Sequence, residues 1–212
     1  MNYQSLTAKI LINIKAINFN FKKPYILTSG KKSPVYVDCR KIISFTKERN
    51  QIMDITEKYF RKNKIKFDIL AGGETAGIPY AAILADRLKK PMIYIRKKPK
   101  GFGKNSQIEG DFKTGQKAIL IEDLATDGGS KVKFIKAMKK AKLKVKDTFV
   151  IFYYGLLNQG ELTLNKLGIN IHYLCTWHNV LNEIKKGKIL QNKDIESIEK
   201  FLFEPNNWKI NG

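Results

Sequence analysis

Cysteine is scarce in this chain. Its 212 residues include two cysteines, Cys39 and Cys175, and their separation matches neither the close pairs that bind zinc nor a disulfide framework. A buried, reduced thiol is the preferred interpretation of each. The scarcity therefore favours a cytoplasmic protein without a cysteine-bound metal.

Long hydrophobic runs are also missing. The apolar stretch from Ile10 to Ile14 lies between Lys9 and Lys15 and is much shorter than the roughly 20 residues that cross a bilayer. No small-residue cleavage site follows it. We therefore expect a docking helix here, with no membrane anchor and no signal peptide.

Acidic residues and arginines are few. The chain has 40 Lys and Arg residues against 19 Asp and Glu, a net charge of +21, and only five of the basic residues are arginines. Such a charge can indicate a nucleic-acid surface, but contacts to phosphate and guanine favour arginine, and the lysines are scattered along the sequence. A solvated lysine coat is the preferred interpretation, with a polyanion-binding face as the alternative.

Alternating strand and helix patterns fill most of the sequence, without repeats or low-complexity linkers. Hydrophobic residues make up 43% of the chain, and the pattern predicts one α/β domain over 1–212, with a mostly parallel central sheet flanked by helices. Residues 1–45 would form an N-terminal helix and a small hood, and residues 46–212 the α/β core and C-terminal helix. Helices are expected within 3–17 and at 46–62, 78–89, 129–142, 162–167 and 195–203, with Thr46 as the N-cap of the second. Strands or extended pieces are expected at 25–27, 35–38, 67–71, 92–95, 118–121, 148–153 and 169–175.

Ligands of such sheets bind at the carboxyl ends of the strands, so the loops after strands are informative. The first is Gly72-Gly73-Glu74-Thr75-Ala76-Gly77. Its glycines expose backbone N–H groups at a helix start, which suits a pyrophosphate. It matches neither a Walker A loop nor a dinucleotide fingerprint. A turn that serves only helix packing is the alternative.

The second loop runs from Arg96 to Ser106 and carries five cationic side chains and two glycines. Connections of this length inside a compact domain are often functional lids. A cationic lid would close over a polyanion and exclude water. An exposed charged loop without function is the alternative.

The third loop follows an apolar run, Ile119-Leu120-Ile121, with Glu122-Asp123 and then the turn from Thr126 to Ser130. Main-chain N–H groups at Gly128, Gly129 and Ser130 could hold a phosphate. Carboxylates would repel that phosphate, so the two acids are expected to accept hydrogen bonds from a diol. A phosphorylated sugar satisfies both halves of the motif, whereas two acids that merely end a strand are the alternative.

Together the three loops resemble those of the type I phosphoribosyltransferases, whose signature is an apolar strand, two acids and a Thr/Gly-rich phosphate loop. The segment from Leu27 to Arg40, with its Ser-Gly-x-x-Ser-Pro-x-Tyr pattern, looks like the hood of the orotate phosphoribosyltransferase family. Further similarities to that family lie at Gly77-Ile78-Pro79, at the start of the lid and at Ile108-Glu109-Gly110.

The resemblance implies transfer of a phosphoribosyl group from phosphoribosyl pyrophosphate to orotate, giving orotidine 5′-monophosphate in pyrimidine synthesis. It implies Mg²⁺ carried mainly by the substrate pyrophosphate, with no metal-ligating residues assigned, and a homodimer in which the lid reaches the neighbouring site. Asp123 and Lys100 would be the catalytic residues, Asp123 through positioning and electrostatics. Substrate-binding residues would be Glu122, Thr126, Asp127, Gly128, Gly129, Ser130, Arg96, Lys97, Gly73, Glu74, Thr75, Ala76 and Tyr36.

The base-recognition segments depart from the family pattern. Thr28 and Phe102 stand where many members have Lys and His, Thr75-Ala76 replaces Tyr-Lys, and no arginine follows the strand that ends at Tyr153. The ring is expected to meet main chain of the hood near Tyr36 or Val37, together with Thr126. Two alternatives therefore stay open: a phosphoribosyltransferase for another base, and a phosphoribosyl-pyrophosphate-sensing regulator that binds nucleic acid, although no helix-turn-helix segment is present.

Overall fold

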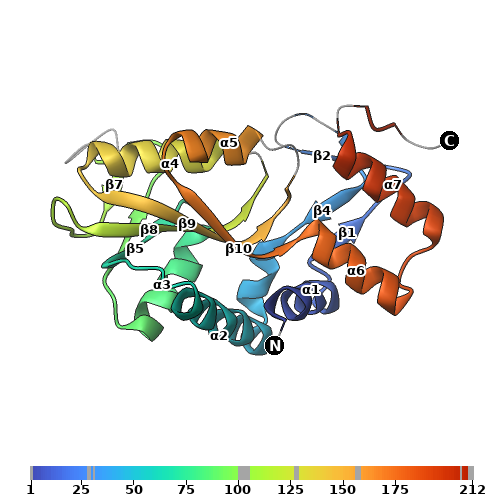
Figure 1. Cartoon of the computed structure of the whole chain (residues 1–212), viewed down its shortest axis with the longest axis horizontal. Coiled ribbons are helices and arrows are strands. Elements are labelled where there is room, and N and C mark those ends of the chain that lie inside the picture. Colours follow the sequence, from blue (N-terminus) through green and yellow to red (C-terminus); the bar gives the residue numbers. More distant parts are fainter. Residues whose placement is uncertain are drawn as a thin grey trace.

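A six-stranded sheet forms the centre of the fold, in the order β10-β9-β8-β5-β6-β7. Five of these strands run parallel, and β7 pairs antiparallel with β6 at one edge. Helices α4 and α5 lie along one face of the sheet, and α2 and α3 lie along the other (Figure 1). The predicted fold class is thereby confirmed.

The computed structural model describes residues 2–27, 30, 32–99, 106–126, 129–155, 159–205 and 207–209. The helices are α1 (Tyr3–Asn13), the 3-10 helix η1 (Cys39–Ser44), α2 (Thr46–Lys62), α3 (Gly77–Leu88), α4 (Gly129–Lys140), α5 (Gln159–Lys166), α6 (Trp177–Gly187) and α7 (Asn192–Phe203). The strands are β1 (Ile17–Phe19), β2 (Tyr25–Ile26), β3 (Lys32–Ser33), β4 (Val35–Val37), β5 (Ile69–Gly73), β6 (Met92–Ile95), β7 (Ile108–Glu109), β8 (Lys117–Ala125), β9 (Lys144–Tyr153) and β10 (Asn170–Thr176).

The central strands are buried on both faces, which explains their continuous apolar runs. Side chains alternate along β8: Ile119 and Ile121 pack in the core that includes α2 and α3, whereas Leu120 packs in the core that includes α4. Burial of each large aliphatic side chain contributes about 1.5–3 kcal/mol. The sheet is therefore held rigidly between two apolar layers.

The hood lies at one end of the sheet, beside the C-terminal helices α6 and α7 (Figure 1). Its strand β1 pairs antiparallel with β4, with Ile17 opposite Val37. Helix α1 packs against α6, where the Ser5 hydroxyl donates to Glu183 Oε1 over 2.9 Å. The two ends of the chain thus support the hood together.

Several sequence predictions differ from the structure. Helix α2 has the predicted bounds, but Phe45 is its N-cap and no side chain caps it, so the assignment of Thr46 was wrong. Strand β8 continues to Ala125, so Glu122 and Asp123 lie within the strand and do not follow it. Elements that the sequence did not predict are α6, η1, β1, β3 and β7.

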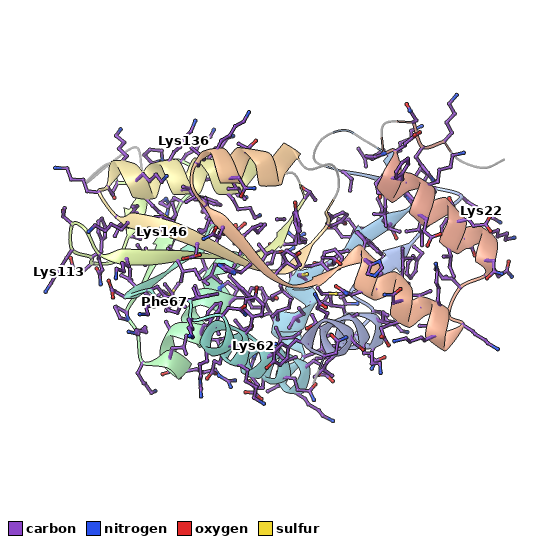
Figure 2. The ribbon with its side chains drawn as sticks, in the orientation of Figure 1. Lys22, Lys62, Phe67, Lys113, Lys136 and Lys146 are labelled. Carbon is purple, nitrogen blue, oxygen red and sulfur yellow. The ribbon has the colours of Figure 1, made fainter. Side chains whose placement is uncertain are left out.

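Lysines lie around the whole outline of the molecule (Figure 2). The labelled Lys22, Lys62, Lys113 and Lys136 are all exposed and belong to different parts of the fold. This distribution agrees with the preferred interpretation of a solvated coat.

Candidate active site

The candidate site lies where the strand order of the sheet reverses. Strand β5 has β6 on one side and β8 on the other, so the connections leave β5 and β8 in opposite directions and open a crevice at their carboxyl ends. Ligands of open α/β sheets bind at such a switch point. The ends of β5 and β8 are Gly73 and the stretch from Glu122 to Ala125, so two of the three predicted loops meet here.

Two glycines make room for the Glu122 side chain. A Cβ atom on Gly73 would approach Glu122 Oε1 to under 3.0 Å, and one on Gly77 would stand 2.8 Å from the same oxygen. Any larger residue at either position would displace this carboxylate. The glycines of the first loop therefore serve close packing around Glu122, and pyrophosphate binding by this loop stays a prediction.

Glu122 and Asp123 form a buried carboxylate pair. They are 6% and 8% exposed. Glu122 Oε2 lies 3.2 Å from the ammonium of Lys131, and Asp123 Oδ1 accepts the Leu124 backbone N–H over 2.8 Å. Within the described part of the chain, Glu122 Oε1 is buried without a hydrogen-bond partner. Such an oxygen is costly in an empty fold and is explained if a ligand hydroxyl or cation satisfies it.

Burial raises the pKa of both carboxyl groups. For Glu122 the main opposing cause is the Lys131 ammonium. For Asp123, Lys131, the Leu124 N–H and Arg40 oppose the rise. The pKa values of the pair thus depend on burial and on a few nearby cations and donors, as is often found at functional sites.

Lys131 is a site residue that the sequence did not reveal. It lies in the first turn of α4, is 4% exposed, and donates to the Leu124 carbonyl oxygen as well as to Glu122. Its position directly after the Gly-Gly-Ser turn was the available signal. Among so many lysines, however, a buried one cannot be recognised from sequence.

The phosphate turn is described in part. Thr126 follows β8 and is half-buried, and Gly129 begins α4, so this helix starts close to the carboxyl end of β8. Phosphate binding at the helix start stays a prediction. Asp127 and Gly128 lie outside the described residues.

The turn after β5 is joined to the start of the lid. Glu74 Oε2 accepts the Lys97 backbone N–H over 2.6 Å, and the Glu74 N–H donates to the Ile95 carbonyl oxygen over 2.9 Å. The peptide bond between Glu74 and Thr75 is cis. Arg96 Nη1 stands 3.8 Å from Glu109 Oε1 on β7. The loops predicted to meet pyrophosphate are therefore neighbours, while Lys100 and the rest of the lid to residue 105 lie outside the described residues.

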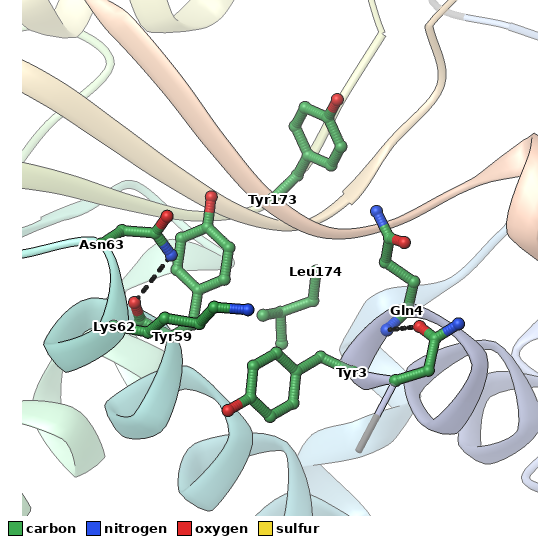
Figure 3. A pocket seen from close by; sticks show the side chains of 8 residues that line it. Tyr3, Gln4, Tyr59, Lys62, Asn63, Tyr173 and Leu174 are labelled. Atoms are coloured by element: carbon green, nitrogen blue, oxygen red, sulfur yellow. Dashed lines mark hydrogen bonds between the residues drawn. The ribbon is translucent and has the colours of Figure 1, made fainter.

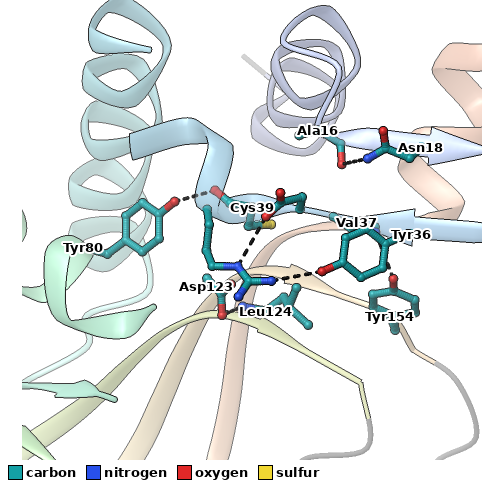
Figure 4. Close-up of polar contacts among 11 residues, drawn as sticks. Ala16, Asn18, Tyr36, Val37, Cys39, Tyr80, Asp123, Leu124 and Tyr154 are labelled. Carbon is teal, nitrogen blue, oxygen red and sulfur yellow. Dashed lines mark hydrogen bonds and ion pairs between the residues drawn. The ribbon is translucent and has the colours of Figure 1, made fainter. Parts of the chain in front are cut away.

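The hood is fastened above the end of β8 by two tyrosine hydroxyls. Tyr80 donates to the Cys39 carbonyl oxygen over 2.6 Å, and the Val37 N–H donates to the Tyr154 hydroxyl over 3.1 Å. Tyr36 and Asp123 consequently face a common space (Figure 4). The base-binding role of Tyr36 stays a prediction.

A cavity of about 270 Å³ opens between α1, α2 and β10, away from the switch point. Figure 3 shows Tyr3, Tyr59 and Lys62 around it. None of the predicted site residues lines this cavity.

Among the described residues, no helix combines the length and apolar character needed to cross a membrane. These residues also contain no cluster of three or more His, Cys, Asp or Glu side chains arranged to hold a metal ion.

Comparison with known proteins gives a consistent result. Residues 44–167 match the model of the phosphoribosyl transferase domain. A protein of Ruegeria sp. (strain TM1040) named orotate phosphoribosyltransferase is 46% identical over 206 residues, which cover 96% of this chain and 91% of the relative. One of the same name from Allorhizobium ampelinum is 45% identical over 205 residues, covering 96% of this chain and 89% of the relative.

Solved structures agree with the sequence relatives. The orotate phosphoribosyltransferase of Aeropyrum pernix has a TM-score of 0.73 and 26% identity, covering 84% of this chain and 99% of that chain. The UMP synthase of Leishmania donovani has a TM-score of 0.80 and 27% identity, with 93% of this chain covered. The chain spans 42% of the length of that synthase.

Proposed function

Because the chain belongs to the orotate phosphoribosyltransferase family, we propose that it transfers the phosphoribosyl group of phosphoribosyl pyrophosphate to orotate. The products are orotidine 5′-monophosphate and pyrophosphate, in pyrimidine biosynthesis. The observation that carries the proposal is the meeting of the buried Glu122–Asp123 pair with a glycine-rich turn and a helix start at the switch point of the sheet.

In this proposal the two ends of the ribose meet different chemistry. Glu122 and Asp123 accept hydrogen bonds from the ribose hydroxyls, since ionised carboxylates are pure acceptors. The turn from Thr126 through Asp127, Gly128 and Gly129 to Ser130 holds the 5′-phosphate at the start of α4. The base lies towards the hood, beside Tyr36.

The leaving group lies on the opposite side of the site. Main chain from Gly73 through Glu74 and Thr75 to Ala76 faces the pyrophosphate, and Arg96, Lys97 and Lys100 supply positive charge from the lid. The C1′–O bond breaks with its electron pair on pyrophosphate, a C1′–N bond forms to the ring, and the ring proton passes to water. Prepositioned cations stabilise the negative charge that develops on the leaving group. A closed lid also fixes the geometry of the reactants, an effect worth up to about 7–11 kcal/mol.

Mg²⁺ is compatible with the residues present. The buried oxygen of Glu122 and the adjacent Asp123 carboxylate are hard oxygen donors, and Mg²⁺ typically binds through one or two carboxylates plus substrate phosphates while keeping several waters. When bound, it neutralises negative charge on pyrophosphate. We propose that the substrate carries the ion into the site.

We further propose that two subunits share each active site. A homodimer in which the lid reaches the neighbouring site would place Lys100 at the partner's pyrophosphate. The cytoplasmic location stays a prediction from composition. Sedimentation of the purified protein, and mixing of subunits that carry Lys100→Ala with subunits that carry Asp123→Asn, would test the shared site. Partial activity in the mixture is expected only if lid and site come from different subunits.

A turnover assay tests the function directly. The protein, phosphoribosyl pyrophosphate and Mg²⁺ are incubated with orotate, uracil or purine bases, and nucleotide and pyrophosphate are measured. Turnover with orotate alone is expected, with loss of activity on chelation of Mg²⁺. Lys100→Ala should slow turnover by roughly tenfold or more, about 1.4 kcal/mol in the barrier. Turnover of another base only would favour the first alternative, and salt-sensitive nucleic-acid binding without turnover would favour the regulator.

A further inference from the structure

Arg40 occupies a defined position at the edge of the candidate site. It lies in η1, directly after the hood strand β4. Its Nη2 donates to the Tyr36 hydroxyl over 3.0 Å, and its Nε lies 3.4 Å from Asp38 Oδ1. The side chain is still 59% exposed. Two contacts thus orient the guanidinium while leaving it open to a ligand.

The backbone on which Arg40 stands is fixed to the core. The preceding residue, Cys39, is fully buried, and its carbonyl oxygen accepts the Tyr80 hydroxyl. Ile42, two residues further along η1, is also fully buried. These contacts fix the backbone on both sides of Arg40; Figure 4 shows the Tyr80 hydroxyl directed at Cys39.

The guanidinium lies within electrostatic reach of the carboxylate pair. Arg40 opposes the burial that raises the pKa of Asp123. Although desolvation lowers the pKa of Arg40, Tyr36, Asp38 and Asp123 together raise it. The cation therefore stands between the residue proposed to flank the base and the residue proposed to bind the ribose.

We propose that Arg40 recognises the ring carboxylate of orotate. The inference rests on the proposed function, because it concerns the base of that reaction. The carboxylate of orotate is attached to the carbon next to the nitrogen that bonds to C1′. With the ribose hydroxyls at Glu122 and Asp123, that carboxylate must lie close to the ribose and on the hood side, where Arg40 stands.

The geometry of arginine suits this role. A guanidinium carries five N–H groups and forms paired hydrogen bonds with a planar carboxylate. Within the described part of the chain, the contacts with Tyr36 and Asp38 occupy one group each. The other N–H groups of Arg40 can therefore bind an anion. Tyr36 would then lie next to both the orotate ring and the guanidinium that binds the orotate carboxylate.

Steady-state kinetics of Arg40→Gln and Arg40→Lys test the inference, with the exposed Arg61→Gln on α2 as matched control. Arg40→Gln should raise the KM for orotate at least roughly tenfold, about 1.4 kcal/mol, and leave the KM for phosphoribosyl pyrophosphate within about threefold. Arg40→Lys should recover part of the loss. Equal thermal midpoints of the three variants exclude misfolding as the cause.

A second measurement separates carboxylate recognition from a general effect. The wild-type protein should bind orotate at least tenfold more tightly than its neutral carboxamide in competition assays, and Arg40→Gln should lose this preference. A raised KM for phosphoribosyl pyrophosphate with an unchanged preference would overturn the inference and place Arg40 at a phosphate. If the wild type turns over orotate and Arg40→Gln still prefers orotate to the carboxamide as strongly as the wild type, the inference is wrong but the proposed function stands. Absence of orotate turnover in the wild type would remove both.

Discussion

Acidic side chains at two places on the same sheet have pKa values shifted in opposite directions. Near the carboxyl ends of the strands, burial raises the pKa of Glu122 and Asp123, and one oxygen of Glu122 has no partner among the described residues. In the amino-terminal half of strand β9, Asp147 accepts hydrogen bonds from His172 Nε2 at 2.8 Å and from Asn170 Nδ2 at 3.1 Å. These bonds lower the pKa of Asp147.

The difference separates the proposed ligand site from an acidic residue that stabilises the fold. Asp147 has its donors supplied by the neighbouring strand β10, so its ionised form stabilises the protein. In the Glu122–Asp123 pair, burial outweighs the donors Lys131 and the Leu124 N–H, and Glu122 Oε1 has no donor among the described residues. The ionised form of the pair therefore costs stability until a diol or cation binds.

Asp123→Asn should separate activity from stability. The change removes the proposed acceptor for the ribose hydroxyls, so turnover should fall by roughly tenfold or more. Because the folded-state pKa of Asp123 is raised, the stability linked to this group is fully present below the ordinary pKa and is lost as pH rises through the raised value. Asparagine lacks the buried charge, so the urea midpoint at pH 7 should stay equal or increase. A large drop in the midpoint would show that Asp123 stabilises the fold instead.

Lys131→Met should shift the pH dependence of activity. Loss of the buried ammonium removes the main group that opposes the rise in the pKa of Glu122 and Asp123. The acidic limb of kcat/KM should therefore move upward by about one pH unit, or about 1.4 kcal/mol. The exposed Lys133→Met, two residues further along α4, is the control and should leave the limb in place. Equal profiles for both variants would show that Lys131 does not set the ionisation of the pair.

Asp147→Asn should show the opposite separation from Asp123→Asn. It weakens charge-assisted hydrogen bonds between β9 and β10, so the free energy of unfolding should fall by about 1–2 kcal/mol, with kcat and both KM values unchanged. The pKa of Asp147 is lowered, so its stabilisation is present above the ordinary value and is lost as pH falls through the lowered one. Urea unfolding over a series of pH values from 7 downward should show the difference between wild type and variant decrease as the pH falls below the ordinary value.

Tyr59→Phe should have the smallest effect. The Tyr59 hydroxyl lies 3.4 Å from His172 Nδ1, a long contact on the far side of the ring that meets Asp147. Its loss should lower the free energy of unfolding by about 0.5–1 kcal/mol and leave activity unchanged. Thermal unfolding with Tyr94→Phe as control would detect it, and a change in kcat would contradict the assignment of this cluster to the fold alone.

Local patterns were enough to predict most of the core. The bounds of α2 and β6 agree with the residues expected, and the apolar run before Glu122 indicated the central strand because both of its faces are buried. The pattern could not locate the end of β8, since acids are rarely buried and their place in the strand depends on Lys131 and the facing glycines.

The unpredicted parts depend on distant partners. Strand β1 has three residues and exists through its pairing with β4, and β7 has two residues on the edge of β6. Helix α6 follows strand β10 without a break. Its lysines make the apolar side that packs on α1 difficult to recognise in the sequence. Sequence patterns carry little information about contacts of this kind.

The two hydroxyl anchors of the hood end on main-chain atoms, the Cys39 carbonyl and the Val37 amide. Substitution of the exposed hood side chain Arg40 would therefore leave these two bonds intact, because neither bond uses a hood side chain. In the proposed complex, Tyr36 and Arg40 could be exchanged, and with them the preferred base, while these two bonds stay in place. Recognition of the base by the hood would then be separable from recognition of the ribose by Glu122 and Asp123.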